Sequence, residues 1–152
     1  MFNNKLRKLV RDPKLFFSDM AANQARKLRK LHLKKDGHYN YTVVSAVYNV
    51  SAFLDDYFKS FVTQRINFKK NIQLILIDDG STDTSAEIIK RWQRKYPKNI
   101  TYIYQENAGQ SAARNNGLQQ VATEWVTFID PDDFVDADYF YNLDNFLYQN
   151  QD

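Results

Sequence analysis

The stretch with the clearest chemical potential is the apolar run that starts at Trp125 and leads directly into Asp130-Pro131-Asp132-Asp133. A hard divalent cation prefers oxygen ligands, and a diphosphate is commonly bound together with such a cation. A strand that ends in Asp-x-Asp therefore indicates a site for a metal-bound nucleotide. The same residues are also good turn formers, so a solvated acidic turn is the alternative interpretation of this motif taken alone.

The elements that position this motif must come from a chain of 152 residues, which is enough for one domain with a hydrophobic core. The chain has no cysteine, which excludes disulfides and thiolate metal sites. No apolar run approaches the roughly 20 residues that span a bilayer. Basic residues at positions 5, 7, 8 and 11 interrupt any apolar signal-peptide region. We therefore interpret the chain as cytoplasmic.

The charge is distributed unevenly along the chain. Residues 1–38 hold 11 Lys/Arg against 3 Asp, a balance of +8, whereas residues 39–152 hold 10 Lys/Arg against 15 Asp/Glu, a balance of −5. We expect a basic helical leader over 1–38, with two short helices separated near Pro13, and a folded domain over 39–152. The acidic domain argues against nucleic acid as a partner. The basic leader suits an anionic membrane surface, and a helical hairpin packed on its own domain or on a partner is the alternative.

After Gly37 the sequence alternates between strand and helix patterns. The expected strands cover 41–47, 72–77, 101–104 and 125–129. The expected helices cover 52–64, 84–96, 111–121 and 137–148. Ser51 and the capping box Thr84-Ser85-Ala86-Glu87 are expected to cap the first two helices. The pattern predicts a doubly wound, mostly parallel α/β sheet whose ligand lies beyond the carboxyl ends of the strands.

The loops after the strands do not match two common phosphate-binding motifs. A dinucleotide-binding fold needs glycines in the first strand–helix turn, but Tyr48-Asn49-Val50 has none. A phosphate-binding P-loop needs a Gly-Lys-Ser/Thr triplet, and the sequence contains no such triplet. Polar residues nevertheless follow each strand, so we expect them to gather at one edge of the sheet.

Four segments carry a resemblance to a known family. They read "TVVSAVYNVSAFLDDYFKSFVTQ", "QLILIDDGSTDTSAEII", "QENAGQSAARNNGL" and "WVTFIDPDDF". In this order, each at the end of an expected strand, they resemble the family 2 glycosyltransferases, which have the GT-A fold with its Rossmann-like nucleotide-binding half. One departure is Ser45-Ala46, where the family usually has Ile-Pro.

The resemblance implies roles for particular residues. Asp79, with Asp78, would bind the nucleotide base, for which uracil is suitable because a carboxylate can accept its imide N–H. Asp130 would bind ribose hydroxyls and contribute to the metal site, while Asp132 would bind Mn²⁺ or Mg²⁺, with Asp133 as a possible support. The remaining residues assigned to the sugar donor are Tyr48, Asn107 and Arg114. Arg114 could instead form a structural pair with Asp79 or Asp130.

The implied reaction transfers a sugar, with inversion, from a nucleotide diphosphate-sugar such as a UDP-sugar to a saccharide hydroxyl. The general base of such enzymes normally lies on a later segment, so we expect it beyond the end of this sequence. The given chain is therefore expected to bind the sugar donor with little or no turnover. It would be the front part of a capsule or surface-polysaccharide transferase. Exposed apolar surface would favour a homo-oligomer.

Two other functions remain open from the residues alone. One is a non-catalytic nucleotide-binding or assembly module. The other is a metal-dependent nucleotidyltransferase or phosphatase, which would release pyrophosphate or phosphate rather than UDP.

Overall fold

The structure is a computed structural model that describes residues 34–150. The chain divides into two compact units, Met1–Lys34 and Lys35–Asp152. The two expected leader helices fall mainly in residues 1–33, outside the described part. Sequence analysis ended the leader after His38, but the second unit begins at Lys35. The reason is local bonding: Lys35 bridges to Ile66, and the His38 amide donates to the Asp144 carboxylate at 2.9 Å.

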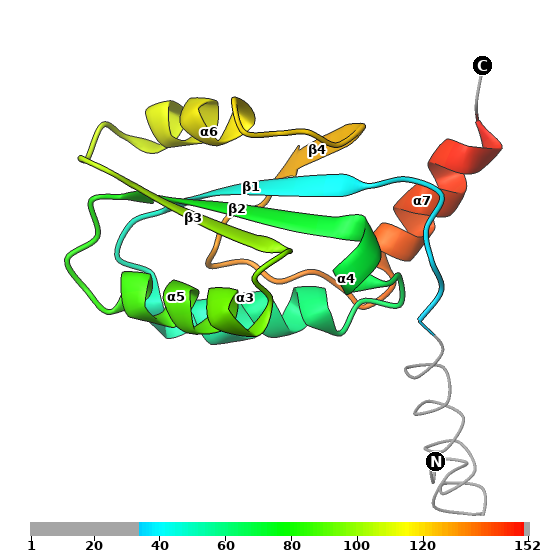
Figure 1. Ribbon diagram of the computed structural model, residues 1–152, viewed down its shortest axis with the longest axis horizontal. Helices are drawn as coiled ribbons and strands as arrows, with labels where there is room; N and C mark the ends of the chain where they lie inside the picture. The colour runs from blue at the N-terminus through cyan, green and yellow to red at the C-terminus, as the bar shows by residue number, and fades with distance from the viewer. Residues whose placement is uncertain (1–33, 151–152) are drawn as a thin grey trace, which may run out of the picture. The chain divides into compact units, whose positions relative to one another are not determined.

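Four parallel strands form the sheet in the order β3-β2-β1-β4 (Figure 1). Their bounds are β1 Tyr41–Val47, β2 Ile72–Asp79, β3 Ile100–Gln105 and β4 Trp125–Phe128. The chain adds β2 and β3 on one side of β1 and then returns to place β4 on the other side. This reversal is the topological switch point at which such sheets bind ligands. The predicted parallel α/β architecture is confirmed.

Helices cover both faces of the sheet (Figure 1). Helices α3 (Ser51–Val62) and α5 (Ser85–Lys95) lie on one face, and α6 (Gln110–Leu118) lies on the other. A short helix, α4 (Phe68–Asn71), precedes β2 and was not predicted, while α7 (Tyr139–Gln149) follows the acidic motif. Among the described helices, none is both long and apolar enough to cross a membrane.

The two central strands are buried on both faces. On β1 and β2, side chains alternate between a large core under α3 and α5 and a smaller core under α6. Val43 and Leu74 belong to the first core, whereas Val44 and Ile75 belong to the second. Gly117 lets α6 approach closely, because a Cβ at this position would lie 2.4 Å from Val44 Cγ1.

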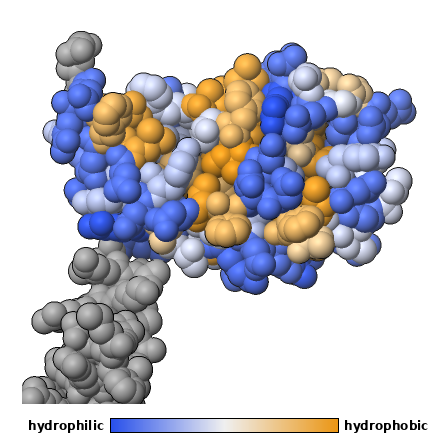
Figure 2. Space-filling view, turned by 180° about the vertical axis from the view of Figure 1, so that it is seen from behind, coloured by the Kyte–Doolittle hydropathy of each residue, from blue (hydrophilic) through white to orange (hydrophobic). Residues whose placement is uncertain are grey.

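The edge strand β4 is much more exposed than the central strands. Trp125, Val126 and Phe128 each keep 40–44% of their surface. Figure 2, which views the molecule from behind, shows apolar side chains gathered in a band on that face. The Trp125 ring makes an edge-on contact with the Tyr39 ring, with the ring centroids 6.1 Å apart. The expected self-association stays a prediction.

A single carboxylate, Asp83, replaces both expected helix caps. Ser51 is the first residue of α3 rather than its cap, and the Thr84 side chain makes no capping hydrogen bond. Instead, Asp83 accepts hydrogen bonds from the Ser51 amide at 3.0 Å and from the Ser85 amide at 2.9 Å. The cap predicted at Ser51 is therefore wrong, and Thr84 lies at the N-cap position of α5 without the predicted side-chain hydrogen bond, because the loop brings one carboxylate to the first turns of two helices.

Replacing Asp83 with Ala should lower the free energy of unfolding at pH 7 by about 1–2 kcal/mol, because free amides appear at two helix starts. Partial burial raises the pKa of Asp83, but hydrogen bonds from Ser85 and Ser51 outweigh this effect and lower the pKa to about 2. The stabilisation is therefore complete above the unfolded pKa of about 3.9 and is lost as pH falls through about 2. Urea unfolding of the wild type and of Asp83→Ala between pH 7 and pH 2 tests this. The difference between their free energies of unfolding should shrink as the pH falls, and a constant difference would contradict the prediction.

Candidate functional site

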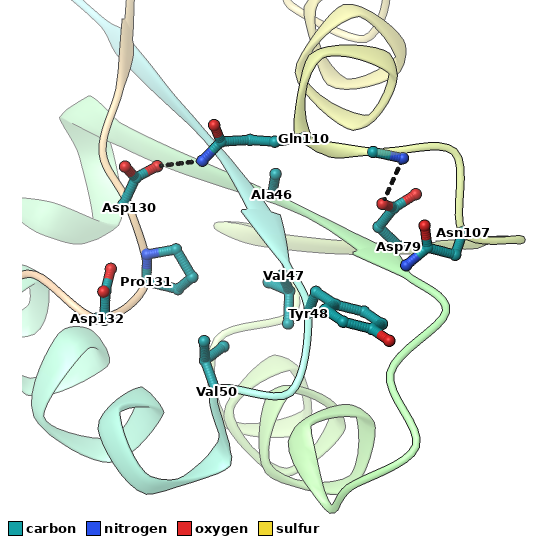
Figure 3. Close-up of a pocket in the computed structure, with 11 residues that line it drawn as sticks. Ala46, Val47, Tyr48, Val50, Asp79, Asn107, Gln110, Asp130, Pro131 and Asp132 are labelled. Carbon is teal, nitrogen blue, oxygen red and sulfur yellow. Dashed lines mark hydrogen bonds between the residues drawn. The ribbon is translucent and has the colours of Figure 1, made fainter.

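A cavity of about 470 Å³ opens at the carboxyl ends of the four strands. Every strand contributes to it through the segment where the strand ends or the loop that follows (Figure 3). Its lining comprises Ala46, Val47, Tyr48, Val50, Asp79, Asn107, Gly109, Gln110, Asp130, Pro131 and Asp132. Asp79 and Asn107 lie on one side, and the Asp130–Asp132 segment lies on the other (Figure 3). Acidic residues from distant parts of the chain thus meet at one rim.

The two neighbouring aspartates at the end of β2 have different surroundings. Asp79 lines the cavity and accepts hydrogen bonds from the amides of Ala108 (2.9 Å) and Gly109 (2.8 Å). Asp78 does not line it: its carboxylate accepts the Ser81 amide and the Tyr102 hydroxyl, both at 2.8 Å. Because successive strand residues face opposite sides of a sheet, only one of the pair can reach the cavity. The geometry supports a ligand contact for Asp79 and a structural role for Asp78.

Burial raises the pKa of the Asp79 carboxyl, but the hydrogen bonds from Ala108, Gln105 and Gly109 outweigh burial and hold its pKa below the ordinary value. At neutral pH, Asp79 is therefore an anionic hydrogen-bond acceptor. Such a group suits a partner that offers an N–H.

On the opposite side, Asp130 and Asp132 follow the edge strand. Arg114 donates to Asp130 Oδ1 at 2.6 Å, and Gln110 donates to the same oxygen at 3.4 Å (Figure 3 shows the Gln110 contact). Of the two structural partners expected for Arg114, the structure therefore shows Asp130 rather than Asp79. Arg114 is not among the residues that line the cavity. Its contact with a sugar donor stays a prediction.

Within the part of the chain that the structure describes, Asp132 is the carboxylate of the motif that is both unpaired and at the cavity. It is exposed, it lines the cavity, and it makes no hydrogen bond or ion pair with another residue in the described range 34–150. Pro131, which is buried, separates it from Asp130. Asp133 is exposed and is not among the residues that line the cavity.

The donor set fits a divalent cation that arrives with a diphosphate. Within residues 34–150, no group of three or more acidic or imidazole side chains forms a metal-binding cluster. Mg²⁺ and related ions, however, are commonly held by one or two carboxylates together with phosphate oxygens and water. Asp132, with Asp130 beside it, supplies that smaller number of oxygen ligands.

The departure from the family pattern at Ser45 has a structural role. The Ser45 hydroxyl donates to the Ile129 carbonyl at 2.5 Å and shares a hydrogen bond of 2.7 Å with the buried Tyr57 hydroxyl. Ile129 directly precedes Asp130. The hydroxyl therefore ties the end of β4 to β1 and helps fix where the acidic motif begins.

Tyr48 and Asn107 both line the cavity, and their contact with a sugar donor stays a prediction. Tyr48 keeps 52% of its surface exposed, so its ring is free to face a ligand. The adjacent Asn49 has a positive φ of 54° and accepts hydrogen bonds from Thr82 and Asp83 amides. This contact connects the loops after β1 and β2.

Sequence analysis missed three amide side chains at this edge. Gln105 Nε2 donates to Asp79 at 2.7 Å, Asn116 donates to Gln105 at 2.8 Å, and Gln110 lines the cavity. Sheet register could have revealed the first, because Gln105 on β3 is the direct partner of Asp79 on β2.

The fold and site together define an α/β domain with an acidic cavity at its topological switch point. The profile of Glycosyl transferase family 2 matches residues 42–152, and the chain belongs to that family. It is 41% identical over 114 residues to the minor teichoic acid biosynthesis protein GgaB of Bacillus subtilis. It is 45% identical over 102 residues to the glycosyltransferase GlyA of Streptococcus pneumoniae. These alignments cover 75% and 67% of this chain, but only 13% and 14% of those proteins.

Solved structures show the same fold. Residues 1–349 of S. aureus TarS superpose with a TM-score of 0.67 at 24% identity, covering 72% of this chain and 32% of that one. The mannosyltransferase PcManGT from Pyrobaculum calidifontis gives a TM-score of 0.65 at 23% identity, covering 86% and 40%. The expected GT-A fold is thereby confirmed.

Proposed function

We propose that this domain binds the nucleotide diphosphate-sugar of a glycosyltransferase, with a UDP-sugar as its ligand and Mn²⁺ or Mg²⁺ as its cofactor. The observation that carries the proposal is the placement of Asp79 and Asp132 on the same cavity. The nucleotide base would contact Asp79, and the metal-bound diphosphate would lie beside Asp130 and Asp132.

Structures with related folds support this assignment of ligands. TarS has been crystallised with UDP-GlcNAc and with UDP, and PcManGT with GDP-Man and Mn²⁺. The uracil ring carries an imide N–H that Asp79 can accept, whereas cytosine and adenine lack this group. Tyr48, from the loop after β1, would contact the base or ribose, and Asn107 would close the same side of the cavity.

The reaction that we propose is transfer of the sugar, with inversion, to a hydroxyl of a growing saccharide. When bound, the metal would offset negative charge on the departing diphosphate. Asp132 would hold the cation and Asp130 the ribose hydroxyls, while Arg114 keeps the Asp130 carboxylate in place through their ion pair. The relationship to GgaB favours a surface polymer as the acceptor.

Inversion also needs a general base for the acceptor hydroxyl. The carboxylates that line the described cavity are Asp79, Asp130 and Asp132. In this proposal each of them holds the sugar donor or the metal. We therefore propose that the 152-residue chain binds the sugar donor and transfers it slowly or not at all.

Calorimetric titration of the 152-residue chain with UDP, with and without Mn²⁺, tests the proposal. UDP should bind with Mn²⁺ and at least about tenfold more weakly after chelation, since the cation offsets diphosphate charge. Replacing Asp79 with Asn should weaken binding in both conditions, whereas Asp78→Asn reports only on folding. The absence of UDP binding in either condition would refute the proposal.

Product analysis separates the remaining alternatives. Incubation with UDP-sugars and saccharide acceptors should give at most slow release of UDP. Release of pyrophosphate or phosphate instead would indicate nucleotidyltransferase or phosphatase chemistry. UDP release at rates typical of enzymes, about 1 per second or faster, would contradict the proposed low turnover.

A further inference from the structure

The hydrogen bonds around Asp79 leave one acceptor position for a ligand. Each carboxylate oxygen has two lone pairs. Oδ1 accepts Gln105 Nε2 at 2.7 Å and the Ala108 amide at 2.9 Å, while Oδ2 accepts the Gly109 amide at 2.8 Å. The remaining lone pair belongs to Oδ2, on a residue that lines the cavity.

A second amide sets the orientation of the Gln105 side chain. Asn116 Nδ2 donates to Gln105 Oε1 at 2.8 Å, so the Gln105 oxygen faces Asn116 and its NH₂ group faces Asp79. Both side chains are half-buried. The neighbouring Gly117 allows α6 to lie close against the sheet, and this close packing places Asn116 within reach of the end of β3.

We propose that Gln105 and Asn116 are positioning residues that determine base specificity by holding Asp79 as a pure hydrogen-bond acceptor. A base with a ring N–H, such as uracil, then finds a partner. Cytosine presents a ring nitrogen lone pair at the same position and meets a second acceptor. This inference rests on the proposed function, because it assumes that the base contacts Asp79.

One substitution can reverse the direction of the hydrogen bonds that run from Asn116 through Gln105 to Asp79. In Asn116→Asp, the new carboxylate cannot donate to Gln105 Oε1 and instead accepts from Gln105 Nε2. The Gln105 amide then turns over and presents its oxygen to Asp79. Gln105 Oε1 then faces Asp79 Oδ1, and two acceptors in contact repel each other. The Asp79 carboxylate therefore turns away from the orientation that presents Oδ2 to a ring N–H, and the preference for uracil is lost.

Other ionisable groups at this edge remain unchanged in the variant. Arg114 is paired with Asp130, and within residues 34–150 no charged side chain is hydrogen-bonded to Asp79. The titratable groups that line the cavity or adjoin Asp79 are Tyr48, Asp78, Tyr102, Asp130 and Asp132. They are common to both proteins, and UDP and CDP carry the same diphosphate, so a ratio of the two affinities cancels most of their contribution.

The experiment measures Kd for UDP and for CDP at fixed Mn²⁺ by calorimetry. The wild type should bind UDP at least about tenfold more tightly than CDP, as expected for a buried charge-assisted hydrogen bond. In Asn116→Asp the ratio should fall to about one. Gln105→Met, which removes the NH₂ donor without reversing it, should reduce the preference by about threefold. Asn115→Asp adds the same charge at an exposed neighbouring position and should keep the wild-type ratio.

The ratio of the two affinities distinguishes positioning from a structural defect. In Asn116→Asp, UDP binding should weaken while CDP binding changes little. A general loss of structure would weaken both ligands together. Thermal unfolding checks folding, and if Asn116→Asp does not fold, Gln105→Met decides the question.

The outcomes separate this inference from the proposed function. A wild type that binds neither nucleotide overturns both. A wild type that prefers UDP, with the same preference in both variants, overturns the role of Gln105 and Asn116 alone.

Discussion

In the presence of Mn²⁺, Asp132→Asn is expected to weaken UDP binding by roughly 100-fold, which corresponds to about 2.7 kcal/mol. The reason is that Asp132 lines the cavity and its carboxylate has no partner in the described chain, whereas Asp130 is already engaged by Arg114. An amide in its place removes the anionic oxygen that a hard cation requires. Calorimetric titration with and without Mn²⁺ measures the effect.

The comparison with and without Mn²⁺ separates a loss of metal binding from any other effect of the substitution. Without Mn²⁺, the wild type and Asp132→Asn should bind UDP with similar low affinity. Glu106→Gln is a suitable control, because it removes one negative charge from an exposed residue near the site that does not line the cavity. Equal affinity of wild type and Asp132→Asn in both conditions would remove Asp132 from the site.

The largest expected effect on stability comes from Asp144, which lies on α7 and is not among the residues that line the cavity. Its buried carboxylate accepts hydrogen bonds from the His38 ring at 2.7 Å, the Tyr41 hydroxyl at 2.9 Å and the Tyr39 amide at 3.2 Å. Burial raises the pKa of Asp144, but hydrogen bonds from His38 and Tyr41 outweigh it and keep the pKa below its usual value. This group fastens α7 to the start of β1.

Asp144→Ala is expected to lower the free energy of unfolding by about 3–5 kcal/mol, because it leaves the Tyr41 hydroxyl and neighbouring amides without an acceptor. Tyr41 is only 1% exposed, so water cannot replace the lost contact there. Urea denaturation followed by circular dichroism measures the change. Asp56→Ala, which removes an exposed carboxylate paired with Lys59, should change stability by less than about 1 kcal/mol. Similar losses in the two variants would contradict the structural role of Asp144.

The sequence predicted which edge of the sheet carries the cavity, but it did not predict the contacts among the residues there. Alternating strand and helix patterns place the loops after the strands at one sheet edge. Asp79 and the Asp130–Asp132 segment are therefore expected to lie at that edge. Which of Asp78 and Asp79 faces the cavity depends on which face α6 covers. That packing is fixed by long-range contacts such as Gly117 against Val44, which no local pattern reveals.

Helix caps and neutral amides illustrate why the rest could not be predicted. A capping box is a local pattern, but Asp83 bonds to the start of a helix 32 residues away as well as to its own. Gln105 acts through register: it lies opposite Asp79 only because β2 and β3 pair in one alignment. Both depend on tertiary placement rather than on residue type and spacing.

The burial of the strands has a consequence for how a ligand meets this cavity. Asp79 extends from a strand whose residues are nearly all buried, whereas Asp130 and Asp132 follow a four-residue edge strand that is mostly exposed. Segments with few buried contacts open at low free-energy cost. The side of the cavity formed by β2 is therefore more rigid than the side formed by the segment after β4. We expect Asp79 to keep its position when a ligand binds, and the exposed segment that carries Asp132 to adjust its conformation on binding, at a cost in affinity.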